Sequence, residues 1–246
     1  MDTATPVFTD IADWQEDFRP PYPAAILDVI VEALGHPLEG VRVADIGAGT
    51  GRWTLQLVSA GVGPISAVEP NTRMRANGAR ATAGLDVAWH AATGTDTGLP
   101  SAAFDLVTWG SSFHHAALDA ALDESLRLLA PSGCLAILSQ GRKHARRAIS
   151  TSSRGALALA TLADALDERV PDRSLAVVAI EETHLFSVAQ ARGYLNAVAY
   201  LQQPEAADAL AEELAELAGA PNRQVAWHFV TSAVVVSAAG GESIGT

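Results

Sequence analysis

A glycine-rich turn between two apolar patterns is the first feature of the sequence that could do chemistry. Residues 41–57 read VRVADIGAGTGRWTLQL, with an apolar run up to Ile46 and glycines at positions 47, 49 and 51. Apolar residues resume after the glycines at a helical spacing, so the pattern predicts a strand, a glycine loop and a helix. Such a junction directs free N–H groups and the positive end of a helix dipole at a ligand above the strand.

The spacing of the glycines separates the possible ligands. A dinucleotide fingerprint G-x-G-x-x-G needs a third glycine where this chain has Arg52. A P-loop needs Lys-Ser or Lys-Thr after the glycines, and neither follows here. The sequence therefore disfavours a phosphate-loop enzyme and an NAD(P)-dependent oxidoreductase, although the oxidoreductase stays open as an alternative.

Two acidic residues suit S-adenosylmethionine, which has an ammonium group and a ribose diol but no phosphate. Asp45 begins the glycine loop, where a carboxylate can accept from the ammonium. Glu69 ends the next apolar run, ISAVEP, about 20 residues beyond the loop, the separation at which an acidic residue binds both ribose hydroxyls. We expect the Glu69 carboxylate to be solvated when the site is empty.

At this point the chain resembles the class I S-adenosylmethionine-dependent methyltransferases. Their motif D-x-G-x-G-T-G is matched over residues 45–51. The resemblance implies S-adenosylmethionine as cofactor, S-adenosylhomocysteine as product and a small-molecule acceptor. It also implies cofactor contacts from the loop and from the end of the second strand: Asp45, Gly47, Ala48, Gly49, Glu69 and Pro70.

Two later segments extend the resemblance. TGTDTGLP, residues 93–100, is similar to the family's G-D-A-E-x-L-P, with Thr95 at the usual acidic position and Asp96 after it. Either Thr95 or Asp96 is then expected at the adenine amine, the alternative being a plain polar loop. The bend containing Trp109 and Gly110 should lie beside the methionine end of the cofactor, although Trp109 could equally pack in the core.

The N-terminal segment FRPPYPAAIL is similar to an R-P-x-Y-P stretch of small-molecule methyltransferases, where it forms part of a lid. The resemblance implies that Arg19 pairs with the cofactor carboxylate and that Tyr22 hydrogen-bonds nearby. The other interpretation is that the prolines only begin the following helix and leave Arg19 in solvent.

His114 and His115 follow the fourth expected strand, where the family often has a histidine that faces the substrate. Either imidazole could remove a proton from the acceptor, or catalysis could depend on proximity alone. His184 and Glu182 are weaker candidates. No Cys/His spacing resembles a zinc pattern, so we expect no metal site.

Composition narrows the partners. The 246 residues carry a net charge of −12, which disfavours nucleic acid as a partner. The one cysteine, Cys134, lies in an apolar run and predicts a buried thiol. No stretch predicts a signal peptide or membrane span, so we expect a cytoplasmic protein without membrane association, monomeric or homodimeric. The basic segment GRKHARR (141–147) predicts a solvated loop or a surface that steers an anionic substrate.

Strands and helices alternate up to about residue 141. Strands are expected near 41–46, 65–68, 86–93, 104–112 and 134–140, a helix capped by Asn71 over 71–82, and a helix over 117–133 ended by Pro131 and Gly133. Further helices are expected over 189–201 and 204–217, and a last strand over 224–238.

This order predicts an α/β fold: a three-layer, Rossmann-like, seven-stranded and mostly parallel sheet whose last strand is antiparallel, with a helical lid. We expect one domain, comprising a lid segment (1–35), a cofactor-binding core (36–141), substrate and lid helices with one strand (142–220), the closing strand (221–239) and a tail (240–246). Some proteins of this fold keep the cofactor without methylating, as cyclases or binding modules, and that alternative stays open.

Overall fold

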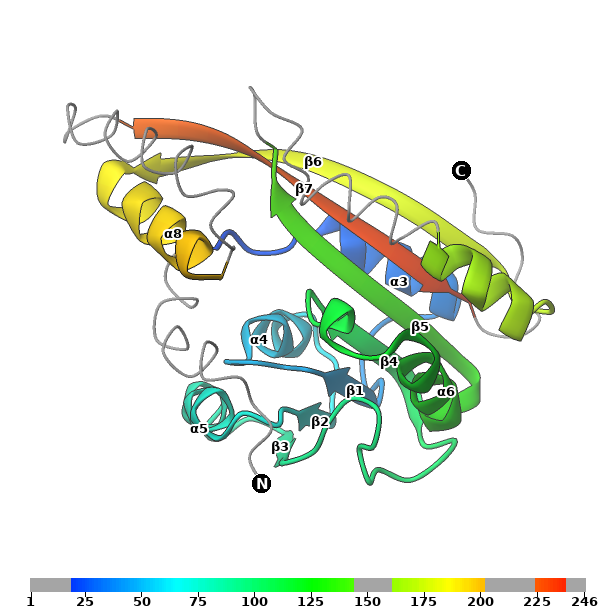
Figure 1. Ribbon diagram of the computed structural model, residues 1–246. Helices are drawn as coiled ribbons and strands as arrows, with labels where there is room; N and C mark the ends of the chain where they lie inside the picture. Colours follow the sequence, from blue (N-terminus) through cyan, green and yellow to red (C-terminus); the bar gives the residue numbers. More distant parts are fainter. Residues whose placement is uncertain (1–18, 144–160, 202–223, 238–246) are drawn as a thin grey trace.

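A twisted seven-stranded sheet lies at the centre of the computed structural model, which describes residues 19–143, 161–201 and 224–237 (Figure 1). The strand order is β3-β2-β1-β4-β5-β7-β6. The strands are β1 Val43–Ile46, β2 Ile65–Val68, β3 Val87–His90, β4 Phe104–Gly110, β5 Leu129–Arg142, β6 Leu175–Ser187 and β7 Gln224–Val236. β1 to β5 pair in parallel, whereas β7 is antiparallel to both β5 and β6. The predicted fold class and the antiparallel last strand are confirmed.

Helices cover both faces of the sheet. Their bounds are α3 Ala25–Leu34, α4 Arg52–Ser59, α5 Thr72–Ala81, α6 Leu118–Leu128 and α8 Val188–Leu201, and a 3-10 turn, η1, lies at Phe113–His115. Buried side chains of α3 and α4 pack on one face of the central strands, and those of α6 and of helical residues 161–169 pack on the other. Figure 1 shows this layering, with α8 standing apart at one end of β6 and β7.

The apolar strands explain the layering. All four residues of β1 are buried, as expected for a central parallel strand with helices on both faces. Side chains that alternate along such a strand enter two separate clusters, so Val43 packs toward α3 and α4 while Ala44 packs toward α6. The carboxyl ends of β1, β2 and β4 thus meet at one edge of the sheet, where ligands of open α/β sheets bind.

The junction between α6 and β5 differs from the prediction. The helix ends at Leu128, and Pro131 and Gly133 lie inside β5 instead of ending the helix. The chain is already extended at Leu129 (φ −65°, ψ 131°), and Pro131 disfavours helical backbone at Ala130, so the helix cannot continue to Gly133. Pairing with β4 then shifts between Phe104 and Leu106, which leaves residues 130–133 as an irregular stretch of the strand.

In the later part of the chain, β5 is longer than the strand expected over 134–140, whereas β7 ends two residues before the expected bound at 238. β5 extends over 14 residues and β6 and β7 over 13 each. The expected helix over 204–217 and the tail lie outside the described residues, and the proposed division of the chain into segments stays a prediction. Among the described helices, none is long and apolar enough to cross a membrane. Cys134 is buried as predicted, and burial raises the pKa of its thiol to about 12.

Candidate functional site

The glycine loop connects the carboxyl end of β1 to the first turn of α4. Gly47 (φ 66°) and Gly49 (φ 61°) adopt left-handed backbone conformations, which side chains other than glycine rarely tolerate. A Cβ at Gly47 would lie 2.5 Å from the Cβ of Ser112, because the β4–α6 connection passes directly over it. A Cβ at Gly49 would meet no atom of the described residues within 4 Å. The loop is therefore closed by protein at Gly47 and open at Gly49.

Asp45 lies beneath this loop with a carboxylate that is only half satisfied. The side chain is 0% exposed, and the hydroxyl of Thr54 donates to its Oδ2 at 2.6 Å. Its Oδ1 has no hydrogen-bond partner in the part of the chain that the structure describes. Burial, and then the nearby charge of Glu69, raise the pKa of Asp45 to about 7. A buried carboxylate oxygen without a donor is a place for a cationic or hydrogen-bonding ligand group.

Glu69 follows β2 and faces the glycine loop. Its Oε2 accepts from the backbone N–H of Gly49 at 2.9 Å and its Oε1 from that of Asn71 at 2.8 Å. The expectation of a solvated carboxylate is wrong, since the residue is only 6% exposed. Burial raises the pKa of Glu69, while the two backbone hydrogen bonds oppose that shift. Each carboxylate oxygen has a second acceptor direction, so ligand hydroxyls can still bind here. Pro70, the next residue, is half-buried beside it.

The N-terminal segment is held against the loop by side chains of α4 and β5. Gln56 makes two hydrogen bonds of 3.0 Å with the backbone of Tyr22, Arg52 donates to the carbonyl of Pro20, and Gln140 donates to that of Pro21. The glutamine and arginine roles were not predicted. A polar residue such as Gln56 inside an otherwise apolar helical pattern is the sequence signal that could have suggested them.

Tyr22 extends from this segment to the end of β4. Its hydroxyl donates to Ser111 Oγ at 2.9 Å and its ring packs edge-on against Trp53 with centroids 5.0 Å apart. Burial raises the pKa of Tyr22, so the phenol stays neutral. Arg19 is half-buried. The positive charge of Arg19 acts to lower the pKa values of Tyr22, His114 and His115. The structure therefore brings these four predicted residues close together.

His114 and His115 form the turn η1, with ring centroids 3.9 Å apart. Both residues keep exposed surface, so the surrounding chain removes only part of their water. This partial desolvation, followed by the charges of His115 and Arg19, lowers the pKa of His114 to about 4. Desolvation and Arg19 also lower the pKa of His115. Two imidazoles that are neutral near pH 7 therefore stand at the same sheet edge as the glycine loop.

Trp109 and Gly110 end β4 but face different surroundings. The indole N–H of Trp109 donates to Ser125 Oγ at 2.9 Å, and the ring lies in the apolar cluster on the α6 side. The side chain of Trp109 therefore packs in the core, as the second interpretation of this residue expected. A Cβ at Gly110 would lie 3.1 Å from that of Trp53, so this position brings β4 close to α4. Thr95 and Asp96 lie in the loop between β3 and β4, half-buried and exposed respectively.

The basic segment differs from the expected solvated loop. Arg142 is buried in β5 with its guanidinium carbon 4.2 Å from the ring centroid of Trp227. Lys143 pairs with Glu181 at 2.8 Å. A strand that continues through residue 142 buries Arg142 against β7, which the charge pattern alone could not predict. Arg146 and Arg147 lie outside the described residues.

The weaker candidates lie away from the loop, on β6. His184 Nε2 is 3.4 Å from Glu182 Oε2, and its ring packs edge-on against Phe229 with centroids 5.8 Å apart. Over residues 19–143, 161–201 and 224–237, no group of three or more potential metal-ligating residues occurs.

Comparison with known proteins agrees with this geometry. Residues 43–133 match a family model described as a methyltransferase domain. A sequence search against curated proteins gives no match. A candidate type II methyltransferase from Anaeromyxobacter dehalogenans superposes with a TM-score of 0.58 at 19% identity, covering 89% of this chain and 97% of that one.

Two further solved structures share the fold. A candidate methyltransferase of an antibiotic biosynthesis pathway from Anabaena variabilis has a TM-score of 0.57 at 22% identity and covers 85% of this chain and 96% of its own. The (4+2)-cyclase SpnF has a TM-score of 0.50 at 18% identity and covers 99% and 94%. At these identities, structural likeness establishes the fold alone. Residues 43–133 therefore resemble a methyltransferase domain, and the chain has the fold of the class I S-adenosylmethionine-dependent methyltransferases.

Proposed function

We propose that the protein is an S-adenosylmethionine-dependent methyltransferase that transfers a methyl group to a small-molecule acceptor. The observation that carries the proposal is Asp45, a fully buried carboxylate beneath a loop that is open at Gly49. No described residue donates a hydrogen bond to its Oδ1. An ammonium group at this oxygen would supply the missing donor and compensate the buried charge. Pyrophosphate would bring negative charge toward two buried carboxyl groups, which argues against a dinucleotide.

The other residues fit the remaining parts of S-adenosylmethionine. Glu69 would accept from the ribose hydroxyls, beside Pro70, and the backbone of Gly47, Ala48 and Gly49 would approach the nucleoside closely. Thr95 or Asp96 would contact the adenine amine. Arg19 would pair with the carboxylate of the methionine end, near Tyr22 and the backbone of Gly110. When bound, the cofactor supplies an electrophilic methyl group on a sulfonium.

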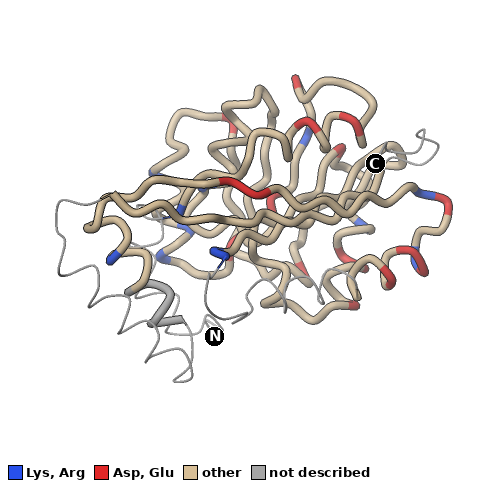
Figure 2. The backbone as a smooth tube through the Cα atoms, turned by 90° about the horizontal axis from the view of Figure 1, so that it is seen from above, with Lys and Arg blue, Asp and Glu red and all other residues tan. Residues whose placement is uncertain are grey.

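The acceptor is proposed to be a small molecule rather than a polynucleotide. Lysine and arginine positions are spread singly or in small groups along the described backbone, and acidic positions predominate in the right half of the view in Figure 2. A net charge of −12 gives little attraction for a phosphate backbone. We further propose that the acceptor belongs to secondary metabolism, as the resemblance to small-molecule methyltransferases suggests.

His114 is proposed to orient the acceptor and to take up its proton, with His115 beside it. Methyl transfer needs the acceptor in line with the sulfonium, and an acceptor hydroxyl must also lose a proton. Because the pKa of His114 is lowered to about 4, its imidazole is neutral and able to accept a hydrogen bond at physiological pH. So weak a base would take up the proton only as the acceptor oxygen becomes more acidic on bonding to the methyl group.

Two measurements test the proposal in sequence. Calorimetry should show micromolar binding of S-adenosylhomocysteine, weakened in Asp45→Asn, whereas micromolar binding of a dinucleotide in its place would overturn the assignment. The second measurement incubates the protein with methyl-deuterated cofactor and a metabolite extract. A product heavier by one labelled methyl supports the transferase. Cofactor binding without any labelled product favours the cyclase or binding-module alternative.

A further inference from the structure

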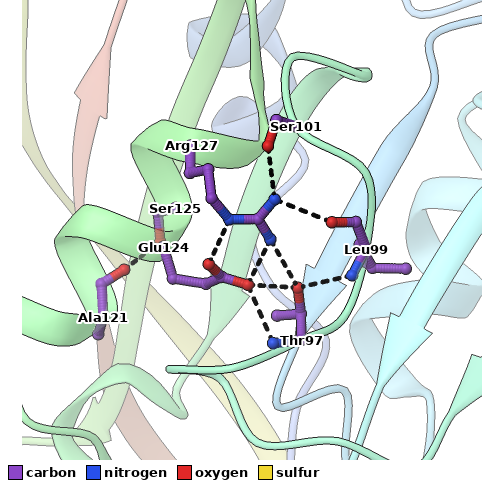
Figure 3. A network of polar contacts seen from close by, with 7 residues as sticks. All are labelled: Thr97, Leu99, Ser101, Ala121, Glu124, Ser125 and Arg127. Atoms are coloured by element: carbon purple, nitrogen blue, oxygen red, sulfur yellow. Dashed lines mark hydrogen bonds and ion pairs between the residues drawn. The ribbon is translucent and has the colours of Figure 1, made fainter.

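The loop between β3 and β4 is fastened to α6 by a charged pair. The guanidinium of Arg127 donates to both oxygens of Glu124, at 2.6 and 2.7 Å. Glu124 Oε1 accepts from the backbone N–H of Thr97 at 2.9 Å and from its hydroxyl at 2.5 Å. Arg127 also donates to the carbonyl of Leu99 at 2.9 Å and to Ser101 Oγ at 2.8 Å. Figure 3 shows these contacts converging on one side of the loop.

This arrangement is stronger than an ordinary surface ion pair. The Glu124 side chain is only 10% exposed and that of Arg127 is 36% exposed. The hydrogen bond from Arg127 lowers the pKa of Glu124 to about 2, so the pair stays charged over the whole physiological range. Bidentate arginine–carboxylate pairs fix geometry as well as charge. The backbone from residue 97 to residue 101 is consequently held in one position relative to α6.

A second attachment from the same helix lies on the other side of the loop's tip. Ser125 accepts the indole N–H of Trp109 at 2.9 Å. A Cβ at Gly94 would lie 2.2 Å from the Trp109 ring, so the chain at Gly94 rests on that ring. Two neighbouring residues of α6 thus fix the loop. Ser125 holds the Trp109 ring on which Gly94 lies, and Glu124 binds Thr97 directly.

Thr95 and Asp96 lie between the two attachments. In the described part of the chain, Thr95 has only a 3.4 Å contact from its hydroxyl to that of Thr93, and Asp96 pairs through its backbone with Thr93. The negative charge of Asp96 also raises the pKa of Arg127, so this carboxylate lies near the guanidinium. Within the described residues, neither side chain has a hydrogen bond to α6, whereas the backbone at Thr97 is bonded to Glu124. Such a short span between fixed points presents its side chains in a narrow range of positions.

We propose that Glu124 and Arg127 are positioning residues that hold Thr95 and Asp96 in place for the adenine amine and so determine the selectivity for adenine. The inference rests on the proposed function, because it takes Thr95 or Asp96 to contact the base. A purely structural role predicts instead that loss of the pair lowers stability without changing which base is preferred.

The test compares two ligands that differ only in the base, where the amine of adenine is replaced by the carbonyl of hypoxanthine and N1 carries a proton. S-adenosylhomocysteine and S-inosylhomocysteine are titrated calorimetrically into the wild type, Glu124→Ala and Arg127→Ala. We expect the wild type to prefer the adenine ligand, and each variant to lose roughly 5-fold or more of this preference, the scale of one misplaced hydrogen bond. Arg169→Ala is the matched control, since Arg169 pairs with Asp119 and Asp123 of the same helix and does not touch the loop.

Two milder variants cover the case in which an alanine variant does not fold. Arg127→Lys keeps the charge but not the bidentate geometry, and Thr97→Val removes the hydroxyl that Glu124 accepts from. Both should lower the ligand preference in the same direction, by less. A preference unchanged within twofold in all folded variants would overturn the inference, as would a wild type that binds both ligands equally. A wild type that binds neither ligand would instead contradict the proposed function.

Discussion

The carboxylate of Glu69 accepts a hydrogen bond from the backbone N–H of Gly49 at 2.9 Å. The residue proposed to bind the ribose therefore also holds the loop proposed to surround the nucleoside. Its second oxygen accepts from Asn71, which caps α5 through hydrogen bonds from the N–H groups of Arg73 and Met74. The loop, the end of β2 and the start of α5 form one connected unit before any ligand binds.

Replacing Glu69 by alanine should weaken both binding and stability. Loss of charge-assisted hydrogen bonds to the ribose should reduce the affinity for S-adenosylhomocysteine by roughly 10- to 150-fold. The buried N–H of Asn71 and the half-buried N–H of Gly49 would also lose their acceptor, at a cost of about 1–3 kcal/mol for a group that water does not reach. Calorimetric titration and thermal unfolding measure the two effects. Glu39→Ala, an exposed acidic residue, is the control. A lower affinity at an unchanged melting temperature would show that the Gly49 and Asn71 contacts contribute nothing to stability.

Asp45 should make the stability of the ligand-free protein depend on pH. Its pKa is raised from 3.8 to about 7, so between these values the folded state holds a proton that the unfolded state has released. Stability should therefore fall as pH rises from about 4 to about 7, with a limiting slope of about 1.4 kcal/mol per pH unit. The acidic group whose charge acts on Asp45 is Glu69. Denaturant unfolding of the wild type and Asp45→Asn over this range gives the contribution of Asp45 as a difference.

The same carboxyl should link cofactor binding to proton release. An ammonium beside Asp45 favours the ionised carboxylate, so binding near pH 6.5 should expel part of a proton and affinity should rise with pH up to about 7. Titrations in buffers of different ionisation enthalpy count the protons. Asp45→Asn should release none from this position and should bind more weakly. Equal proton release from both proteins would place the titrating group elsewhere.

Gly47 and Gly49 should respond differently to alanine. Alanine at Gly47 would place its Cβ 2.5 Å from the Cβ of Ser112, a distance that forces the β4–α6 connection to move. Alanine at Gly49 meets open space and costs only the backbone strain of a positive φ, about 1 kcal/mol. We expect Gly47→Ala to lower the melting temperature more, and Gly49→Ala to lower ligand affinity at a nearly unchanged fold. Thermal unfolding with and without S-adenosylhomocysteine separates the two, and a larger loss of stability in Gly49→Ala would contradict the assignment.

The parts of the site that were predictable depend on local rules. The glycine loop, Asp45, Glu69 and the Asn71 cap follow from residue type and spacing within short segments, and the alternation of strands and helices predicts the sheet. The irregular stretch of β5 does not follow from such rules, because it depends on a distant residue. Arg173 donates to the carbonyls of Pro131 and Gly133, at 3.1 and 2.6 Å. It lies 42 and 40 residues beyond them in the sequence. The burial of Arg142 likewise depends on its contact with the Trp227 ring, and that of Glu69 on its contact with the glycine loop. Both contacts join residues that are distant in the sequence.

The histidine turn gives the sharpest test of the proposed chemistry. Because the pKa of His114 is lowered to about 4, its imidazole should stay neutral above about pH 5, and any rate that depends on it should be lost as pH falls through about 4. His114→Ala should lower the methylation rate of an identified acceptor by roughly 10²- to 10⁴-fold if proton removal is required, with the affinity for S-adenosylhomocysteine within twofold of the wild type. His115→Ala shows which imidazole takes up the proton, because the larger loss of rate should fall on His114→Ala.

The electrostatic origin of this pKa can be checked without an acceptor. The positive charges of His115 and Arg19 add to the desolvation that lowers the pKa of His114, so Arg19→Gln should raise it while leaving the ring in place. An NMR titration of the imidazole protons measures that shift directly. If Arg19 also pairs with the cofactor carboxylate, the same variant should lose affinity for S-adenosylhomocysteine but retain affinity for adenosine, which has no carboxylate. Loss of affinity for both ligands would show that Arg19 supports the N-terminal segment rather than the carboxylate. An unchanged pKa would remove Arg19 from the surroundings of the histidine turn.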